Sequence, residues 1–334
     1  MRVLLLILDA FDPVRLSPHL TPNLWSWANA DGAATGTGEA VMAACTYPNH
    51  ASFATGVPPS EHGIYVNHVI RDDQVVGAWE VGPSVPTLFD SYVAESLAVL
   101  GDHHLVGVMG ARAAASHWPP NGDLPLDIEL DPLGYPADSA VLARLVAGLA
   151  EAARLTIGYF GSIDTYSHLF GPESEEAREA YRRVDGRIAE IEAAISWDEI
   201  AVIVVSDHIQ NTVEDRPGID LRPVVGEGTI LADEGSAILI GATLEPTELM
   251  SVDGVAGARS LDDGNTLAWC EPARFFGPFD SPILRGVHGN VATRTQLAMV
   301  TGGHPKRHLA ADVVNAGPVP ATAWAGVIRS MLDQ

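Results

Sequence analysis

The chain has 334 residues, of which 47% are hydrophobic and 19% charged, so it is long enough to bury a sizeable core. Its formal net charge is -24 and Lys306 is its only lysine, which argues against binding to nucleic-acid polymers or anionic membranes. A small anionic ligand remains compatible with this charge, because bound metal cations invert the local field. The two cysteines, Cys45 and Cys270, make neither a disulfide framework nor a cysteine-rich zinc module.

The N-terminal apolar run, Val3–Leu8, ends at Asp9. It is shorter than the roughly 7–15 apolar residues of a secretory signal, and no run approaches the ~18–20 residues of a membrane span. A short continuous apolar run is typical of a strand that is buried on both faces of a parallel sheet. We therefore expect a soluble cytoplasmic protein whose first strand is 3–8.

Strand and helix patterns alternate along most of the chain, which indicates an α/β fold with a mostly parallel sheet. The predicted helices cover residues 21–29, 51–55, 86–100, 137–154, 173–196 and 322–332. The predicted strands cover 3–8, 104–109, 155–160, 200–205 and 297–301, with a hairpin formed by 67–71 and 75–80. The Pro- and Gly-rich residues 112–135 predict an irregular surface loop.

Between residues 209 and 283 both patterns weaken, apart from a candidate strand at 237–240. We expect this stretch to form a cap or small subdomain, inserted within a single catalytic domain of residues 1–334.

Residues 45–56 read Cys45-Thr46-Tyr47-Pro48-Asn49-His50-Ala51-Ser52-Phe53-Ala54-Thr55-Gly56. Proline is favoured in a first helical turn, so Thr46 is expected at or next to a helix N-terminus. The free backbone N–H groups and the positive dipole end at that point suit an anion such as phosphate. Thr46 as a simple helix cap is the alternative. Cys45 is interpreted as a small buried hydrophobic residue, because no activating pattern points to it.

Asp and His side chains follow the three clearest buried strands or occupy a Gly-bounded turn: Asp9, Asp164 with His168, Asp207 with His208, and His288. Ligands of open α/β sheets collect at the carboxyl ends of strands. Carboxylate and imidazole groups are the ligands that zinc accepts when cysteine is absent. Any one of these residues alone is most often a cap or a surface residue, but their combination favours a metal centre.

The number of ligands suggests two ions. One would be held by Asp164, His168 and His288, and the other by Asp9, Asp207, His208 and the Thr46 oxygen. Asp164 and His168 are four residues apart, which puts both side chains on one face of a helical turn. Two metals about 3.5–4 Å apart can clamp the attacking and leaving oxygens of phosphoryl transfer. Metal coordination would also activate the Thr46 hydroxyl, which is otherwise a poor nucleophile.

Six motifs in order resemble the alkaline phosphatase superfamily, and most closely its nucleotide pyrophosphatase/phosphodiesterase branch. They are Leu8-Asp9-Ala10-Phe11, Thr46-Tyr47-Pro48-Asn49-His50, Glu61-His62-Gly63-Ile64 with Asn67, Asp164-Thr165-Tyr166-Ser167-His168, Ser206-Asp207-His208 and Val287-His288-Gly289. Together they span residues 9–290. Two positions depart from the branch: Ile209 replaces its usual Gly, and Asn290 stands where an aromatic residue is common.

The resemblance implies a three-layer α/β/α domain of the alkaline phosphatase type and a metal-dependent hydrolase of a phosphodiester or pyrophosphate, such as a nucleotide. Thr46 would be the nucleophile and would form a covalent threonine intermediate. Asn67 and the Thr46 backbone N–H would bind the oxygens on which charge builds. The implied cofactors are two divalent metal ions, with zinc preferred over manganese or iron. The oligomeric state stays open.

Several alternatives remain at this stage. A phosphomonoesterase usually needs a cation such as Arg beside the nucleophile, and residues 33–70 contain no Arg. Phosphonate (C–P) hydrolases of the superfamily use lysines at the substrate, although Arg112 or Arg285 could substitute here. Mutases and a non-catalytic metal-dependent binding protein are further alternatives. A sulfatase is disfavoured, because His50 stands where that group carries Arg.

Three aromatic residues lie next to the expected site residues in the sequence: Phe11, Tyr47 and Tyr166. They are candidates for stacking on a nucleobase or another flat substrate group, with packing in the core as the alternative.

Overall fold

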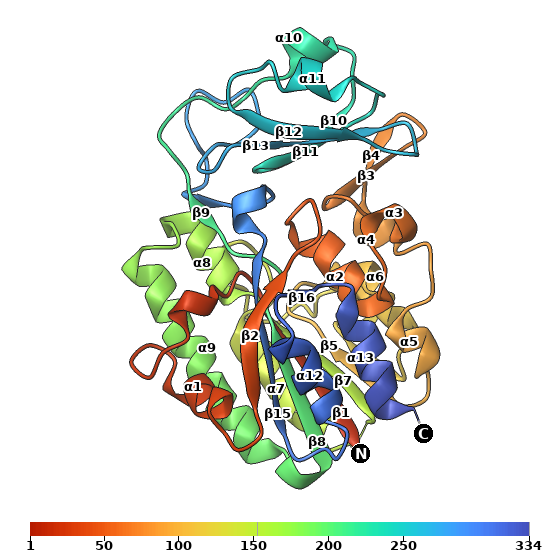
Figure 1. Ribbon diagram of the computed structural model, residues 1–334, viewed down its shortest axis with the longest axis vertical. Coiled ribbons are helices and arrows are strands. Elements are labelled where there is room, and N and C mark those ends of the chain that lie inside the picture. The colour runs from red at the N-terminus through yellow and green to blue at the C-terminus, as the bar shows by residue number, and fades with distance from the viewer. Residues whose placement is uncertain (152, 334) are drawn as a thin grey trace.

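The structure is a computed structural model that describes residues 1–151 and 153–333. Its main sheet has eight strands in the order β16-β2-β15-β8-β1-β7-β5-β6 (Figure 1). The strands are β16 (Val319–Pro320), β2 (Ala34–Glu39), β15 (Thr295–Gly302), β8 (Ile200–Val205), β1 (Arg2–Leu8), β7 (Leu155–Phe160), β5 (Ser96–Val99) and β6 (Ser116–Trp118). Only β15 runs antiparallel to its neighbours in this sheet, so the predicted mostly parallel sheet is confirmed.

Both faces of this sheet are buried under helices, which gives the three layers seen in Figure 1. In β1, Val3, Leu5 and Ile7 belong to one hydrophobic cluster, whereas the alternating residues Leu4, Leu6 and Leu8 belong to the other. Side chains alternate between the faces of a strand, so a continuous apolar run was needed to fill both layers. The expected three-layer α/β/α class is confirmed.

The helices divide between the two faces. One layer contains α2 (Thr46–Thr55), α5 (Leu88–Ser91), α6 (Leu105–Val108), α12 (His308–Asn315) and α13 (Ala323–Leu332). The other layer contains α1 (Pro22–Ala28), α7 (Asp138–Leu149), α8 (Ser162–Phe170) and α9 (Glu175–Ala194). Two short helices, α3 (Pro59–His62) and α4 (Ala78–Val81), flank the hairpin of β3 (His68–Arg71) and β4 (Gln74–Gly77).

A second, antiparallel sheet lies at the end of the molecule drawn at the top of Figure 1. Its strands, in sheet order, are β10 (Leu231–Glu234), β11 (Ala237–Ile240), β13 (Thr266–Cys270) and β12 (Val255–Ser260), with α10 (Arg222–Val225) and α11 (Pro246–Leu249) beside them. Leu239 and Leu267 of this sheet share a hydrophobic cluster with Cys45 and Val66. The small sheet is therefore packed against the segment that leads into α2.

Three local predictions were wrong. Residues 112–135 were expected to be an irregular loop but contain β6, the edge strand of the main sheet. Residues 86–100 were expected to be one helix but contain α5 and then strand β5, because Ser96–Val99 is buried between β7 and β6. Residues 104–109 were expected to be a strand but contain helix α6, ahead of which the Asp102 carboxylate accepts the His104 N–H at 2.9 Å. In short apolar runs such as these, periodicity alone does not separate helix from strand.

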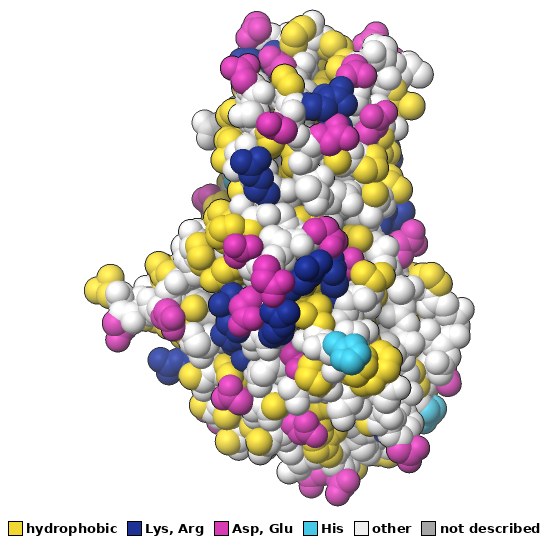
Figure 2. Space-filling model, turned by 90° about the vertical axis from the view of Figure 1, so that its left-hand side faces the viewer, with side chains coloured by type: hydrophobic (Ala, Val, Ile, Leu, Met, Phe, Trp, Pro, Cys, Tyr) yellow, Lys and Arg dark blue, Asp and Glu magenta, His cyan; other side chains and the backbone are white. Residues whose placement is uncertain are grey.

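Basic and acidic side chains intermingle on the face shown in Figure 2. On α9, for example, Arg182 donates to Glu175 at 2.7 Å and to Glu179 at 3.1 Å. Among the residues that the structure describes, no helix combines the length and the apolar character needed to cross a membrane.

Candidate active site

Thr46 is the first residue of helix α2, as its neighbourhood in the sequence predicted. The preceding residue, Cys45, has extended backbone angles, and Gly56 ends the helix with a left-handed φ of 86°. Every residue of α2 is buried, and Thr46 itself is only 7% exposed. Its Oγ1 lies 3.2 Å from His208 Nε2. The hydroxyl is thus held against an imidazole at the positive end of a buried helix.

Two side chains from other parts of the chain, Asn67 and Gln296, hold the start of α2 in place. The Asn67 carboxamide oxygen accepts the Tyr47 N–H at 3.0 Å. Gln296 of β15 donates to the Asp207 carbonyl oxygen at 2.6 Å and to the Asn49 carboxamide oxygen at 3.2 Å. These buried bonds connect the helix to the end of β8, so the position of Thr46 relative to the sheet is set by the protein.

Three neighbouring parallel strands, β8, β1 and β7, bring the predicted aspartates to one edge of the sheet. Asp9 follows β1 directly, and Asp207 lies two residues after β8. Asp164 lies in the first turn of α8, the helix that follows β7, and His168 lies one turn further on. His168 Nε2 is 3.3 Å from the Asp164 carboxylate, and its Nδ1 is 2.8 Å from the Gly286 carbonyl oxygen.

Asp9, Asp207 and His208 form the first group of side chains that could hold a metal ion. His208 Nε2 is 3.6 Å from Asp9 Oδ1 and 3.4 Å from Asp207 Oδ2. All three residues are at most 1% exposed. The same imidazole nitrogen, His208 Nε2, also contacts the Thr46 hydroxyl. This group therefore lies next to the first residue of α2.

Asp164, His208 and His288 form the second group. The imidazoles of His208 and His288 are stacked, with ring centroids 3.9 Å apart. His288 Nε2 lies 4.0 Å from Asp164 Oδ1, and the His168 ring is 5.0 Å from that of His288. The structure therefore brings together all seven expected metal ligands, with His208 near both groups.

The carboxyl groups have strongly perturbed acidities. Burial raises the pKa of Asp207 to about 7, and the Asp164 charge adds to this effect. Burial and the nearby Asp207 and Asp164 raise the pKa of Asp9 well above its ordinary value. Burial would also raise the pKa of Asp164, but His168, His288 and His208 outweigh it and hold that pKa below its ordinary value. Crowding of like charges in a buried site is typical of functional centres.

The donor set fits divalent cations. Asp9 Oδ1, Asp207 Oδ2, His208 Nδ1 and His288 Nδ1 are buried and have no hydrogen-bond partner. Buried charges in proteins are paired or coordinate metals. Oxygen and imidazole nitrogen without thiolate suit zinc, manganese or iron. Burial raises the pKa of the adjacent Cys45 thiol well above its ordinary value, which fits its expected role as a packing residue.

A cavity of ≈ 230 Å³ opens at this centre. Besides the expected residues Asp9, Thr46, Tyr47, Asn67, Asp164, His168 and His288, its lining includes Asp102, Asp131, Leu133, Tyr135, Tyr159, Thr165 and Leu284. Tyr47 therefore lies where it was expected to meet substrate.

The expectation for Phe11 and Tyr166 needs correction. Phe11 is fully buried in the core and packs edge-on against Tyr181, with ring centroids 5.0 Å apart. The Arg183 guanidinium lies over the Tyr166 ring, 4.6 Å from the ring centroid. The Tyr166 ring also stacks on Phe170. Neither residue is among the described residues that line the cavity. Although Phe11 and Tyr166 are close to site residues in the sequence, both pack on neighbouring side chains and neither lines the cavity. This favours the packing alternative.

Part of the cavity lining was not predicted from the sequence. Residues 112–135 were expected to be a surface loop, yet Asp131 and Tyr135 line the cavity. The Asp131 carboxylate accepts the N–H groups of Leu133 and Tyr135, both at 2.9 Å, and the Thr165 hydroxyl proton. No periodic pattern marks this part of the lining, because its residues are positioned by hydrogen bonds within a loop.

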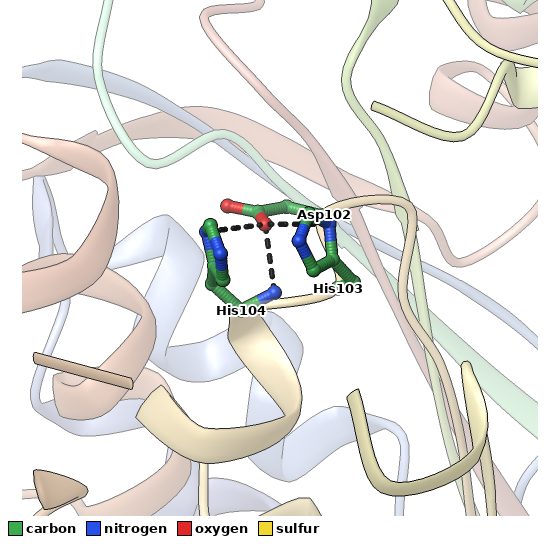
Figure 3. Close-up of side chains that lie close together, drawn as sticks. All are labelled: Asp102, His103 and His104. Atoms are coloured by element: carbon green, nitrogen blue, oxygen red, sulfur yellow. Dashed lines mark hydrogen bonds and ion pairs between the residues drawn. The ribbon is translucent and has the colours of Figure 1, made fainter. Parts of the chain in front are cut away.

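Asp102 was also missed. Figure 3 shows its carboxylate between the imidazoles of His103 and His104. One carboxylate oxygen lies 4.0 Å from His103 Nδ1 and 3.6 Å from His104 Nδ1. His104 Nδ1 also meets the Tyr47 hydroxyl at 3.1 Å, so this cluster supports the side chain next to Thr46. The only sequence signal was a run of polar residues after the unrecognised strand β5.

Comparison with known proteins identifies a family. Residues 3–259 match the family described as type I phosphodiesterase / nucleotide pyrophosphatase. An uncharacterized pyrophosphatase/phosphodiesterase of Schizosaccharomyces pombe is 26% identical over 221 residues, which are 62% of this chain and 44% of that protein. Human ectonucleotide pyrophosphatase/phosphodiesterase family member 1 is 24% identical over 248 residues, which are 70% of this chain and 25% of that protein. The chain thus spans less than half the length of these relatives.

Solved structures share the fold over nearly the whole chain. An inactive threonine-to-alanine variant of murine ectonucleotide pyrophosphatase/phosphodiesterase 5, in complex with AMP, superimposes with a TM-score of 0.76 at 14% identity, covering 100% of this chain and 95% of that one. Phosphonoacetate hydrolase from Sinorhizobium meliloti, in complex with phosphonoformate, gives a TM-score of 0.69 at 15% identity, covering 99% and 96%.

Proposed function

This chain belongs to the type I phosphodiesterase / nucleotide pyrophosphatase family, and we propose that it hydrolyses a small phosphodiester or pyrophosphate through a covalent threonine intermediate. The observation that carries the proposal is the position of Thr46. Its hydroxyl lies at the N-terminus of a buried helix and contacts His208, between two groups of carboxylate and imidazole side chains.

We propose that these groups hold two divalent cations. Asp164, His168 and His288 would hold one, and Asp9, Asp207, His208 and the Thr46 oxygen the other. His208 lies near both groups, and its contact with Thr46 is the reason for assigning it to the second. When bound, such ions stabilise developing negative charge and lower the pKa of coordinated oxygens.

The chain's own residues would then act as follows. The Thr46 oxygen attacks phosphorus, the bond to the leaving oxygen breaks, and water later hydrolyses the phosphothreonine ester. Because the Asn67 carboxamide oxygen accepts the Tyr47 N–H, its NH₂ group is the end left to donate to a phosphate oxygen. The N–H groups at the start of α2 supply further donors where negative charge builds.

The properties of structural relatives support this proposal. A relative of the same fold is inactive when one threonine is replaced by alanine, and that protein binds AMP. The resemblance to phosphonoacetate hydrolase makes C–P cleavage the second candidate. Lys306, the only lysine, instead bonds to the carbonyl oxygens of Ser330 and Asp333, and neither Arg112 nor Arg285 is among the described residues lining the cavity. This arrangement favours ester hydrolysis.

The small sheet provides a further proposal about residues 209–283. We propose that they form a cap on one side of the cavity, within a single catalytic domain. Its support is the shared hydrophobic cluster of Cys45, Val66, Leu239 and Leu267, which packs the small sheet directly behind the nucleophile segment.

The test is a substrate panel on zinc-loaded protein. Bis-p-nitrophenyl phosphate, p-nitrophenyl phosphate, p-nitrophenyl thymidine 5′-phosphate and phosphonoacetate would be compared by kcat/KM. We expect the two diesters to be preferred, because the described residues lining the cavity include no Lys or Arg to meet the extra charge of a monoester. A preference for p-nitrophenyl phosphate or phosphonoacetate would overturn the choice of reaction. Bound zinc with no turnover of any substrate would favour a non-catalytic binding protein or a more specialised substrate.

A further inference from the structure

The turn between β10 and β11 brings the small sheet into contact with the active site. It consists of Gly235 and Ser236, between the paired residues Glu234 and Ala237. Gly235 has the positive φ, 66°, that the first residue of such a tight turn favours. The Ser236 N–H donates to the His288 carbonyl oxygen at 3.0 Å. The small sheet is therefore bonded to the backbone of a candidate metal ligand.

The residue before this turn, Glu234, contacts a second segment of the site. Its carboxylate is hydrogen-bonded to Nδ1 of His68, the first residue of β3. Asn67 directly precedes His68 and lines the cavity, and its carboxamide oxygen accepts the Tyr47 N–H at 3.0 Å. In Figure 1, β3 lies next to the small sheet. Glu234 thus links that sheet to the segment that carries Asn67.

The turn has little freedom to move. The buried Ser236 hydroxyl donates to the Arg274 carbonyl oxygen at 2.7 Å, and the Ser236 carbonyl oxygen accepts the Cys270 N–H at 3.0 Å. Buried bonds of this kind hold a turn in one conformation, because breaking one leaves a polar group unsatisfied. The contacts that the turn makes with the His68 and His288 segments are therefore held at a fixed separation.

From these contacts we infer that the β10–β11 turn positions Asn67 relative to His288, and that Glu234 is a positioning residue which acts through His68. The inference rests on the proposed function, in which the Asn67 carboxamide donates to a phosphate oxygen, and it gives the cap a part in aligning the substrate. Asn67 and His288 both line the cavity, so a change in their separation would misalign a bound phosphoryl group relative to Thr46.

The charges around His68 favour an ionic form of its bond to Glu234 near neutral pH. The bond to Glu234 raises the pKa of His68 above its ordinary value, although partial burial opposes this increase. Other titratable side chains also face His68: Asp233 of β10 and Glu80 of α4, which raise its pKa further, and His104. Charge-assisted hydrogen bonds are roughly twice as strong as neutral ones. The link should therefore weaken as the pH rises through the pKa of His68.

The first test measures kcat/KM for bis-p-nitrophenyl phosphate on zinc-loaded protein. Glu234→Gln keeps an oxygen for the His68 ring but removes the charge. It should lower kcat/KM by about tenfold, within the ~10²-fold cost of a misplacement of about 1 Å. Glu248→Gln is the matched control, because Glu248 is exposed on α11 of the same cap and loses the same charge. Wild-type kcat/KM in both Glu234→Gln and Glu234→Ala would overturn the inference.

A double-mutant cycle separates the positioning of Asn67 from a general loss of stability. In Asn67→Ala the carboxamide that Glu234 positions is absent, so adding Glu234→Gln should lower kcat/KM by at most about twofold more. Residues that act through one another show non-additive effects of this kind. A further tenfold loss in the double variant would overturn the inference, because Glu234 would then act independently of Asn67.

The pH dependence reports on the charged pair. The ratio of kcat/KM between wild type and Glu234→Gln should be largest where His68 is protonated and should fall as the pH rises from about 6 to about 9. Both proteins have the same candidate metal ligands, so the titration of those ligands cancels in the ratio. A ratio that stays constant or increases over this range would overturn the charged pair as the link.

A binding measurement distinguishes this inference from the proposed function. Calorimetric titration of the zinc-loaded protein with inorganic phosphate requires no turnover. Binding that is several-fold weaker in Glu234→Gln than in Glu248→Gln would support the positioning of Asn67 even if no ester were hydrolysed. Equal affinities in the two variants would overturn it.

Discussion

Two pairs of aspartates at the site use the same residue type differently. Asp9 and Asp207, which follow β1 and β8, each leave one carboxylate oxygen buried without a hydrogen-bond partner. Asp102 and Asp131, which line the cavity, accept backbone N–H groups of their own loops. The first arrangement is suited to metal ions, whereas the second fixes the orientation of a carboxylate that lines the cavity. An aspartate's role is thus determined by how its oxygens are satisfied.

The largest expected effect concerns Thr46, the proposed nucleophile. Thr46→Ala should lower kcat for a diester by at least about 10⁴-fold, the scale on which removal of a catalytic nucleophile acts, while zinc content stays close to wild type. Thr46→Ser is the control, because it keeps a hydroxyl at the helix start and should retain measurable turnover. Stopped-flow or plate-reader assays with bis-p-nitrophenyl phosphate provide the measurement. An alanine variant as active as the serine variant would eliminate Thr46 as the attacking group.

Metal affinity should separate the two pairs of aspartates. Asp207→Asn is expected to weaken zinc binding by at least about 100-fold, because even residues outside the ligand shell change metal affinity by 10–100-fold. Asp102→Asn should weaken zinc binding much less, since Asp102 belongs to neither of the two groups around Thr46. Competition with a chromogenic chelator measures both. Equal losses in the two variants would mean that the two pairs do not differ as we describe.

The pH dependence of stability provides a smaller effect of defined sign. The pKa of Asp207 is about 7 in the folded, metal-free protein, above its ordinary value. The folded state therefore holds a proton that the unfolded chain releases, so this carboxyl stabilises the fold below about pH 4 and loses that contribution as the pH rises toward 7. Asp207→Asn should match metal-free wild type near pH 4 and be more stable than it near pH 8.

Denaturant unfolding with and without zinc tests this prediction. Zinc should reverse the order near pH 8, because only the wild type keeps the full ligand set and ligand binding stabilises the folded state. Burial raises the pKa of Asp102 to about 6. The stability of Asp102→Asn relative to wild type should therefore rise with pH in the same way, over a narrower pH range, and zinc should not reverse it. A wild type that gains stability over the variant between pH 4 and 8 without metal would contradict the prediction.

The smallest effect is expected at Tyr166. Tyr166→Phe should leave KM unchanged and shift the free energy of unfolding by no more than about 0.5 kcal/mol, because the ring packs on Phe170 and Arg183 outside the cavity. Tyr47→Phe offers the contrast. Its hydroxyl contacts His104 beside Asp102, so its loss should raise KM for the substrate. A larger change of KM in the Tyr166 variant than in the Tyr47 variant would show that the substrate contacts Tyr166.

The convergence of the candidate metal ligands could largely be predicted from the sequence. Val3–Leu8, Leu155–Phe160 and Ile200–Val205 are apolar on both faces, and such strands belong in a parallel sheet whose carboxyl ends share an edge. Asp9, Asp164 and Asp207 each follow one of these strands, so their convergence follows from local pattern and general topology. Thr46 could be placed at a helix start for a similar reason, because Pro48 and the apolar residues after it are local signals.

The rest of the cavity lining depends on contacts between residues that are distant in the sequence. Asp131 is held by Thr165, 34 residues away, and Tyr47 meets His104, 57 residues away. Phe11 lies two residues from a site aspartate, yet it packs against Tyr181 because the backbone turns at Ala10, whose φ is 54°. Periodicity reports which face of an element is buried, whereas the residues that surround a cavity are chosen by how separate elements meet. For this reason the Asp and His residues at the strand ends could be predicted from the sequence. The other residues that line the cavity, such as Asp102 and Asp131, could be identified only in the folded structure.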